Sequence, residues 1–126
     1  MTTIKSYTDI EQSRKLAKIL PLESADRCYL SEESLVPKVI YNGMAFFDSK
    51  EERLTNVIHC WSLAALFGVL PILDNRSPVI SKTFDRKYRV VYHSTTYEKA
   101  ILTTDYDNPV DACYEMILKL HGLNLL

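Results

Sequence analysis

Basic and aromatic side chains alternate in the second half of the chain, and together these residue types are suited to binding an anion. From Asp74 to Arg89 the chain carries five basic residues against two acidic ones. Cations beside aromatic rings are typical of sites for a nucleotide, a nucleic-acid strand or an acidic protein patch. A solvated loop that leads into an amphipathic strand would give the same pattern, so both interpretations stay open. The candidate ligand-binding residues are Arg86, Tyr88, Arg89, Tyr92 and His93.

Two other groups have the chemistry needed for hydrolysis. A thiol attacks only as the thiolate, and Cys60 lies just before a predicted helix N-terminus, whose dipole favours that form. Asp105 and Asp107 flank Tyr106 and could act as a general acid and base. The competing interpretations are that Cys60 is a small apolar core residue beside Trp61, and that the aspartates belong to a turn before a helix, where acidic groups are favoured.

The spacing of the histidines and cysteines disfavours a metal site. The patterns Cys-x-x-Cys, His-x-x-x-His and His-Glu-x-x-His are all absent. The chain has three glycines, and none of them belongs to a phosphate-binding loop. The sequence therefore predicts no metal ion and no cofactor. The potential metal ligands are Cys28, His59, Cys60, His93, Cys113 and His121.

Two segments resemble a family of small proteins, without an established activity, that prophages and mobile elements of gut anaerobes encode. They are Trp61-Ser62-Leu63-Ala64-Ala65-Leu66 and Asn108-Pro109-Val110-Asp111-Ala112. The resemblance implies an accessory protein that works inside a bacterium, and it transfers no functional residue to this chain. Both segments can also be interpreted as helix caps and core faces.

The last helix is the best-defined element. Asn108 is its N-cap candidate, Pro109 occupies the first helical position and Gly122 follows its end. Apolar residues at helical spacing place Cys113 and His121 on the face that packs against the core. This helix is therefore expected to form the backbone of the core.

Capping and turn residues mark two more elements. Thr8 and Asp9 are N-cap candidates for a first amphipathic helix. Asn42-Gly43 separates two apolar runs, at residues 36–41 and 44–47, and this dipeptide favours the type I′ turn of a hairpin. We therefore expect an N-terminal helix followed by a β-hairpin.

The remaining segments complete the expected architecture. Residues 27–30, 88–94 and 98–104 are predicted to be strands, whereas the charged residues 48–53 are predicted to be a loop. The order α-β-β-α-β-β-α predicts an α+β fold, with an antiparallel sheet of about four strands and three helices. Residues 1–126 are expected to form a single domain.

The middle helix is expected to begin at Ser62 and end at Leu70. It has no polar face, so it must be covered on all sides. A homodimer through this helix would cover it, and so would a central position within one chain; the sequence leaves both open.

Composition and charge exclude some classes of protein. The net charge is −1, which lacks the basic excess of a dedicated nucleic-acid binder or of a polybasic membrane-surface protein. The N-terminal residues lack the apolar core of a signal peptide, and the apolar run at residues 61–73 is too short to span a membrane. Three cysteines far apart suggest reduced thiols and a cytoplasmic location.

The leading functional hypothesis is a non-enzymatic accessory protein of a phage or mobile element that binds a host protein or a small ligand. One alternative is sequestration of a nucleotide-type signalling molecule by the residues around Arg86 and Arg89. Another is a small hydrolase that uses Cys60 or the pair Asp105 and Asp107.

Overall fold

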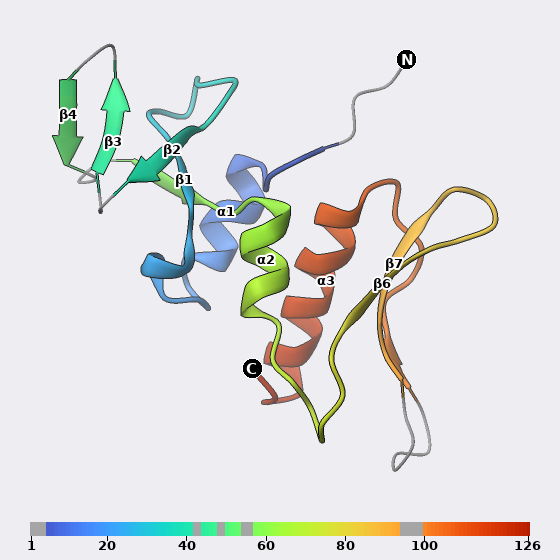
Figure 1. The fold of residues 1–126 in the computed structure, drawn as a ribbon. Coiled ribbons are helices and arrows are strands. Elements are labelled where there is room, and N and C mark those ends of the chain that lie inside the picture. Colours follow the sequence, from blue (N-terminus) through green and yellow to red (C-terminus); the bar gives the residue numbers. More distant parts are fainter. Residues whose placement is uncertain (1–4, 42–43, 48–49, 54–56, 94–99) are drawn as a thin grey trace. The chain divides into compact units, whose positions relative to one another are not determined.

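The computed structural model describes residues 5–41, 44–47, 50–53, 57–93 and 100–126. These residues contain three α-helices and eight strands, all paired antiparallel, so the expected α+β class is confirmed (Figure 1). The expectation of about four strands in one sheet was wrong, because the described strands are more numerous and form two sheets. By its contacts the chain divides into two compact units, Tyr7–Ala65 and a second made of Met1–Ser6 with Leu66–Leu126. The single domain stays a prediction.

Helix α1 (Ile10–Leu16) opens the unit Tyr7–Ala65. Asp9 is its N-cap: the Asp9 carboxylate accepts a hydrogen bond from the Gln12 amide at 2.8 Å, and the Gln12 side chain accepts one from the Asp9 amide at 3.1 Å. This capping box confirms Asp9 of the two expected candidates. Leu16 is fully buried and packs the helix into its unit.

A sheet of strand order β4-β3-β2-β1-β5 forms most of the same unit. The expected hairpin is confirmed by the pairing of Tyr41 with Met44, although Asn42-Gly43 itself lies outside the described residues. The predicted loop at residues 48–53 contains strand β4, because its charged side chains do not prevent main-chain pairing with β3. The strands are β1 (Arg27–Tyr29), β2 (Lys38–Tyr41), β3 (Met44–Phe47), β4 (Lys50–Arg53) and β5 (Ile58–Cys60).

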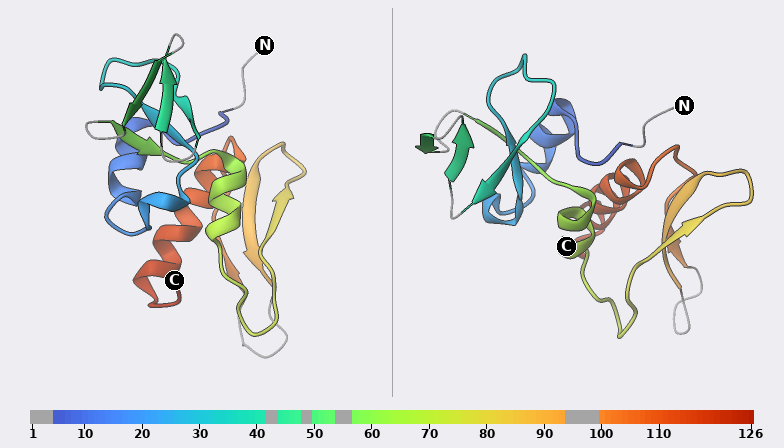
Figure 2. Two further views of the ribbon diagram at one scale, coloured as in Figure 1. Left: turned by 60° about the vertical axis from the view of Figure 1, so that its left-hand side comes forward. Right: turned by 45° about the horizontal axis from the view of Figure 1, so that its top comes forward.

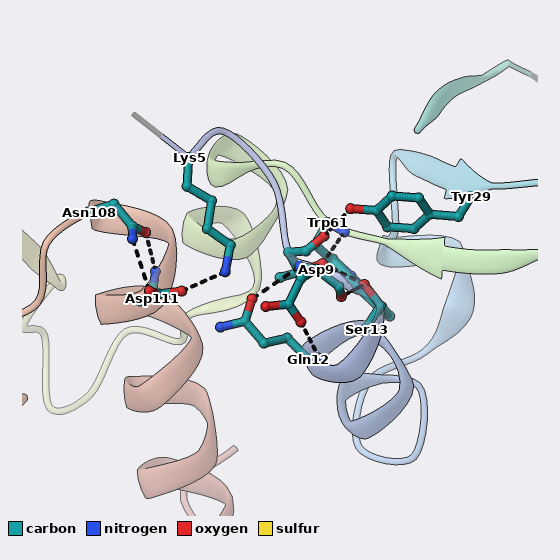
Figure 3. A network of polar contacts seen from close by, with 9 residues as sticks. Lys5, Asp9, Gln12, Ser13, Tyr29, Trp61, Asn108 and Asp111 are labelled. Carbon is teal, nitrogen blue, oxygen red and sulfur yellow. Dashed lines mark hydrogen bonds and ion pairs between the residues drawn. The ribbon is translucent and has the colours of Figure 1, made fainter. Parts of the chain in front are cut away.

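Thr8, the other N-cap candidate, ties α1 to the end of β5. It is fully buried; its hydroxyl accepts from the Trp61 amide at 3.1 Å and lies 2.8 Å from the Ser13 hydroxyl. The Thr8 amide donates to the Trp61 carbonyl at 2.9 Å, and the Tyr29 hydroxyl donates to the Thr8 carbonyl at 2.8 Å (Figure 3). Every polar group of Thr8 is thereby satisfied inside the unit, as burial requires.

Helix α2 (Leu63–Val69) matches the expected middle helix. The Ser62 hydroxyl caps it by accepting from the Ala65 amide at 3.2 Å, and the Ser62 amide donates to Asp26 at 2.9 Å. Leu66 is fully buried, but Phe67 is 38% exposed. The helix is therefore not covered on all sides, and a homodimer through it stays a prediction.

The second unit contains the expected last helix and a three-stranded sheet. Helix α3 (Pro109–Gly122) lies against one face of the sheet β6-β7-β8 (Figure 2). The Asn108 side chain accepts from the Asp111 amide at 2.8 Å, and Lys5 pairs with Asp111 at 2.8 Å (Figure 3). The strands are β6 (Val79–Lys82), β7 (Tyr88–Tyr92) and β8 (Ile101–Leu102).

The C-terminal end of α3 differs from expectation in two respects. Gly122 is the last residue of the helix, and Asn124 has the left-handed conformation, with φ 58°. The amide of Leu125 bonds to the carbonyl of Leu120 at 2.9 Å and that of Asn124 to His121 at 3.1 Å, which is a Schellman motif with asparagine in the usual glycine position. His121 is exposed and does not belong to the packed face.

Candidate functional site

The loop between β6 and β7 is a tight hairpin connection with an exposed aromatic residue. The Thr83 amide donates to the Lys87 carbonyl at 2.7 Å, and the Arg86 amide donates to the Thr83 carbonyl at 3.0 Å. Arg86 has φ 64°, the left-handed conformation that closes a three-residue hairpin loop and that glycine adopts most readily. Phe84 is fully exposed. The loop thus holds a large apolar side chain in water beside a strained cationic residue.

Strand β7 has one face against α3. Val90 and Tyr92 are buried, and the Tyr92 hydroxyl donates to the Pro71 carbonyl at 2.6 Å. Burial, with a smaller effect of Cys113, raises the pKa of Tyr92 to about 12. Because side chains alternate along a strand, Arg89 and Val91 belong to the other face, which we call the outer face.

The outer face is completed by residues from both neighbouring strands. Val79 of β6 and Leu102 of β8 are each opposite Val91 in the register. Val79 is 42% exposed and Leu102 is 41% exposed. The outer face therefore presents Val79 and Leu102 to solvent on either side of Val91, which is itself only 7% exposed.

An open concavity of about 500 Å³ lies on the outer face. It is shallow rather than enclosed, and it has the volume of many ligand sites but not their depth. Its lining combines polar, basic and apolar residues, which include Ser81, Arg89, Val91, His93, Ala100 and Leu102.

A one-residue bulge follows β8. Val91 pairs with Leu102, yet Tyr88 pairs with Tyr106, so one extra residue is accommodated between the two pairs. The Thr103 hydroxyl accepts from the buried Val90 amide at 2.8 Å, and the Thr103 amide donates to the Val90 carbonyl at 2.9 Å. The threonine side chain thus replaces the main-chain acceptor that the bulge displaces.

The bulge brings Asp105 and Asp107 beside basic residues of β7. Asp105 pairs with Arg89 at 2.6 Å, and Asp107 pairs with Lys87. The hydrogen bond and charge of Asp107 raise the pKa of Lys87. With these aspartates included, five cations face four carboxylates, so the local basic excess seen in the sequence is largely neutralised.

The structure brings together only part of the predicted ligand-binding set. Arg89 and His93 both line the concavity. Tyr92 instead has its side chain buried and bonded to Pro71, and the Tyr88 ring lies 5.7 Å from the Lys82 ammonium in a cation–π contact. Because successive side chains of a strand point to opposite faces, the basic and the aromatic residues that alternate along β7 lie on opposite faces of it.

The hydrolytic candidates have structural roles. Cys60 is fully buried, and burial followed by the charge of Asp26 raises its pKa to about 12, so it is a protonated thiol at neutral pH. Asp105 and Asp107 are engaged in the ion pairs with Arg89 and Lys87. This arrangement does not fit a thiolate nucleophile or a free acid–base pair.

The described ranges contain neither a metal-binding cluster nor a membrane-spanning helix. Among those residues no group of three histidine, cysteine or carboxylate side chains is placed to hold a metal ion. Within the same ranges no helix combines the length and the apolar character that crossing a bilayer demands.

Comparison with known proteins gives no relative: no family model, curated protein or solved structure matches the chain. The resemblance to proteins of prophages and mobile elements therefore stays a prediction.

Sequence reasoning missed Phe84, Val79 and Leu102. Strand β6 was not predicted, so Val79 had no assigned face. A detectable signal was present at Phe84, because a single aromatic residue stands among the polar turn residues 83–87. Such a residue has no core to enter from a tight turn.

Proposed function

We propose that the chain is a non-enzymatic binding protein whose partner is another protein, recognised by the β6–β7 loop and the outer face. The observation that carries the proposal is the full exposure of Phe84 beside Arg86, which has a left-handed backbone. Exposed aromatic residues and arginine dominate the energy of protein interfaces. A residue other than glycine costs stability when it is held in a left-handed conformation. Such strained residues are typical of functional loops.

The outer face supports a protein partner more than a small ligand. The concavity is open, so a small molecule would stay largely in solvent, whereas drug-sized ligands are usually mostly buried in their sites. Val79, Leu102 and Phe84 together offer apolar area that a protein surface could cover. The accessory role in a phage or mobile element, inside the cytoplasm of a bacterium, belongs to this proposal as its biological context.

The proposal is tested by capture from a bacterial lysate with matched variants. Phe84→Ser combined with Leu102→Ser removes apolar area from the proposed site. Leu35→Ser is the control, because Leu35 is 90% exposed and lies in the other unit. A protein recovered by the wild type and the control, but not by the double variant, is the expected result. Equal recovery by all three chains would refute the proposed site.

A nucleotide-type anion is a second candidate, favoured by Arg89 and His93 at the concavity. The pairing of Arg89 with Asp105 opposes it, because a phosphate would have to displace that carboxylate. Calorimetric titration with mononucleotides and cyclic dinucleotides tests it. Binding that the variant Arg86→Glu with Arg89→Glu abolishes would support this candidate, and binding that survives the charge reversal would remove it.

A further inference from the structure

Strand β6 is an edge of its sheet, and every second residue of it directs its main-chain groups away from β7. The Thr83 amide bonds to the Lys87 carbonyl, so the main chain of Thr83 faces β7. Main-chain groups of a strand alternate in direction, so those of Ser81 and Val79 face β7 as well. The amides and carbonyls of Ile80 and Lys82 therefore face away from the sheet.

These outward groups form no hydrogen bond with any main-chain group that the structure describes. An unpaired edge is a template for another strand, and proteins usually protect one by keeping it short or by placing lysine on it. Strand β6 has both features, with four residues and Lys82 at its end. A lysine on the edge disfavours pairing with an uncharged or basic strand. It does not disfavour pairing with a strand that carries carboxylates.

The charge at this edge is positive. Within the described residues neither Lys82 nor Arg86 forms an ion pair, and both are exposed. Asp85, the nearest carboxylate in the sequence, accepts a hydrogen bond from the Thr83 hydroxyl, which lowers the pKa of Asp85. Even with this carboxylate ionised, Lys82 and Arg86 outnumber it, and neither is held in an ion pair within the described residues, so a strand that carries carboxylates would find two available cations along this edge.

We infer that an extended acidic segment of the partner protein adds to the edge of β6 as a fourth strand. Main-chain bonds to Ile80 and Lys82 would supply affinity, and carboxylates near Lys82 and Arg86 would supply selectivity. Apolar side chains of the same segment would lie over Val79 on the outer face. This inference rests on the proposed function and names the chemistry of its partner.

A second copy of the chain is a poorer occupant of this edge. Pairing of β6 with itself would bring Lys82 and Arg86 of both copies along one edge. Two copies would place four cations along one seam, and the repulsion among them opposes pairing. The cations therefore favour an acidic partner over self-association.

The first test measures amide hydrogen exchange by NMR in the free chain at low concentration. The Ile80 and Lys82 amides are expected to exchange fast and the Ser81 amide slowly, because only the Ser81 amide bonds to β7. Slow exchange at all three positions would overturn the inference, since the edge would already be covered. Slowing of Ile80 and Lys82 only as a dimer forms would also overturn it, in favour of a second copy.

The second test uses random peptides displayed on phage as the probe. Selected peptides are expected to alternate apolar residues with aspartate or glutamate and to lack proline. Lys82→Pro removes the outward amide without removing a bond to β7, and edge strands tolerate proline at such positions. Lys82→Ala keeps the amide and serves as the control for lost charge.

The expected result is that Lys82→Pro weakens peptide binding by about tenfold more than Lys82→Ala does. Equal binding to the two variants would overturn strand addition. If Phe84→Ser still abolished capture of the partner in that case, the proposed function would stand without it. If Phe84→Ser also left capture unchanged, the proposed function itself would fail.

Discussion

The side chains of Arg89 and Asp105 meet across the point where strand β7 pairs with the irregular segment after β8. The guanidinium Nε donates to one carboxylate oxygen at 2.9 Å, and Nη2 lies 2.6 Å from the same oxygen. The bulge at Thr103 is the cause, because one extra residue shifts the register and places Asp105 opposite Arg89. The ion pair thus depends on the bulge and sets the charge beside the proposed binding face.

The Arg89–Asp105 pair is expected to contribute little to stability. Its side chains are 38% and 36% exposed, so solvent screens their attraction. A double-mutant cycle with Arg89→Ala and Asp105→Ala should give a coupling of about 0.2–1 kcal/mol that falls as salt is added. Urea denaturation of the four chains measures it. A coupling of several kcal/mol, or one insensitive to salt, would show that solvent does not screen the pair.

Thr103 is expected to be important for stability through its hydroxyl. Thr103→Val keeps the shape but leaves the buried Val90 amide without its acceptor at 2.8 Å, which should cost about 1–3 kcal/mol of unfolding free energy. Thr103→Ser keeps the acceptor and is the matched control. Chemical denaturation of both variants decides the matter, and equal stabilities would mean that the hydroxyl is not needed at the bulge.

Replacing Arg86 should separate stability from binding. Arg86→Gly removes the side chain from a residue with φ 64°, so it should raise the unfolding free energy by about 1 kcal/mol. Arg86→Ala keeps Cβ and should give no such gain. Both variants lose the cation and should bind the partner more weakly. A thermal melt and an affinity measurement on the same samples test this, and a destabilised Arg86→Gly chain would contradict it.

Alkaline pH should destabilise the chain through its buried thiols. Burial raises the pKa of Cys60 and of Cys113 to about 12 in the folded chain, whereas an unfolded thiol ionises near about 8.5. Above that pH the unfolded state binds fewer protons than the folded state. The unfolding free energy should therefore fall as pH rises from about 8.5 towards 12, by at most about 1.4 kcal/mol per pH unit for each thiol.

Urea denaturation over a series of alkaline pH values measures this slope. Cys113→Ala provides the comparison, since it removes one titrating group and should make the decline less steep even if the variant is less stable at neutral pH. A slope identical to that of the wild type would mean that Cys113 does not titrate between the two states.

The elements that sequence reasoning predicted well are those with strong local signals. Asp9 and Asn108 cap their helices as expected, since a capping side chain bonds amides only a few residues away. The pairing of Tyr41 with Met44 follows from turn chemistry that is equally local. Strand β4 was missed because its residues are charged, and only the pairing with β3 makes them a strand.

The candidate site could be predicted only in part, for the same reason. The residues of β7 were identified, but which of its faces packs against α3 depends on long-range contacts that a strand of mixed apolar and polar residues does not encode. The neutralisation of Arg89 by Asp105 depends on the bulge at Thr103. A bulge inserted between two short strands leaves no periodicity by which it could be recognised.

The central claim is tested most directly by measuring amide hydrogen exchange of the chain, alone and bound to the captured partner. The proposed function predicts slower exchange at residues 79–91 and 100–105 on binding, with no change in the sheet of the unit Tyr7–Ala65. Protection confined to residues of that other unit, with the β6–β7 hairpin exchanging as in the free chain, would contradict the claim.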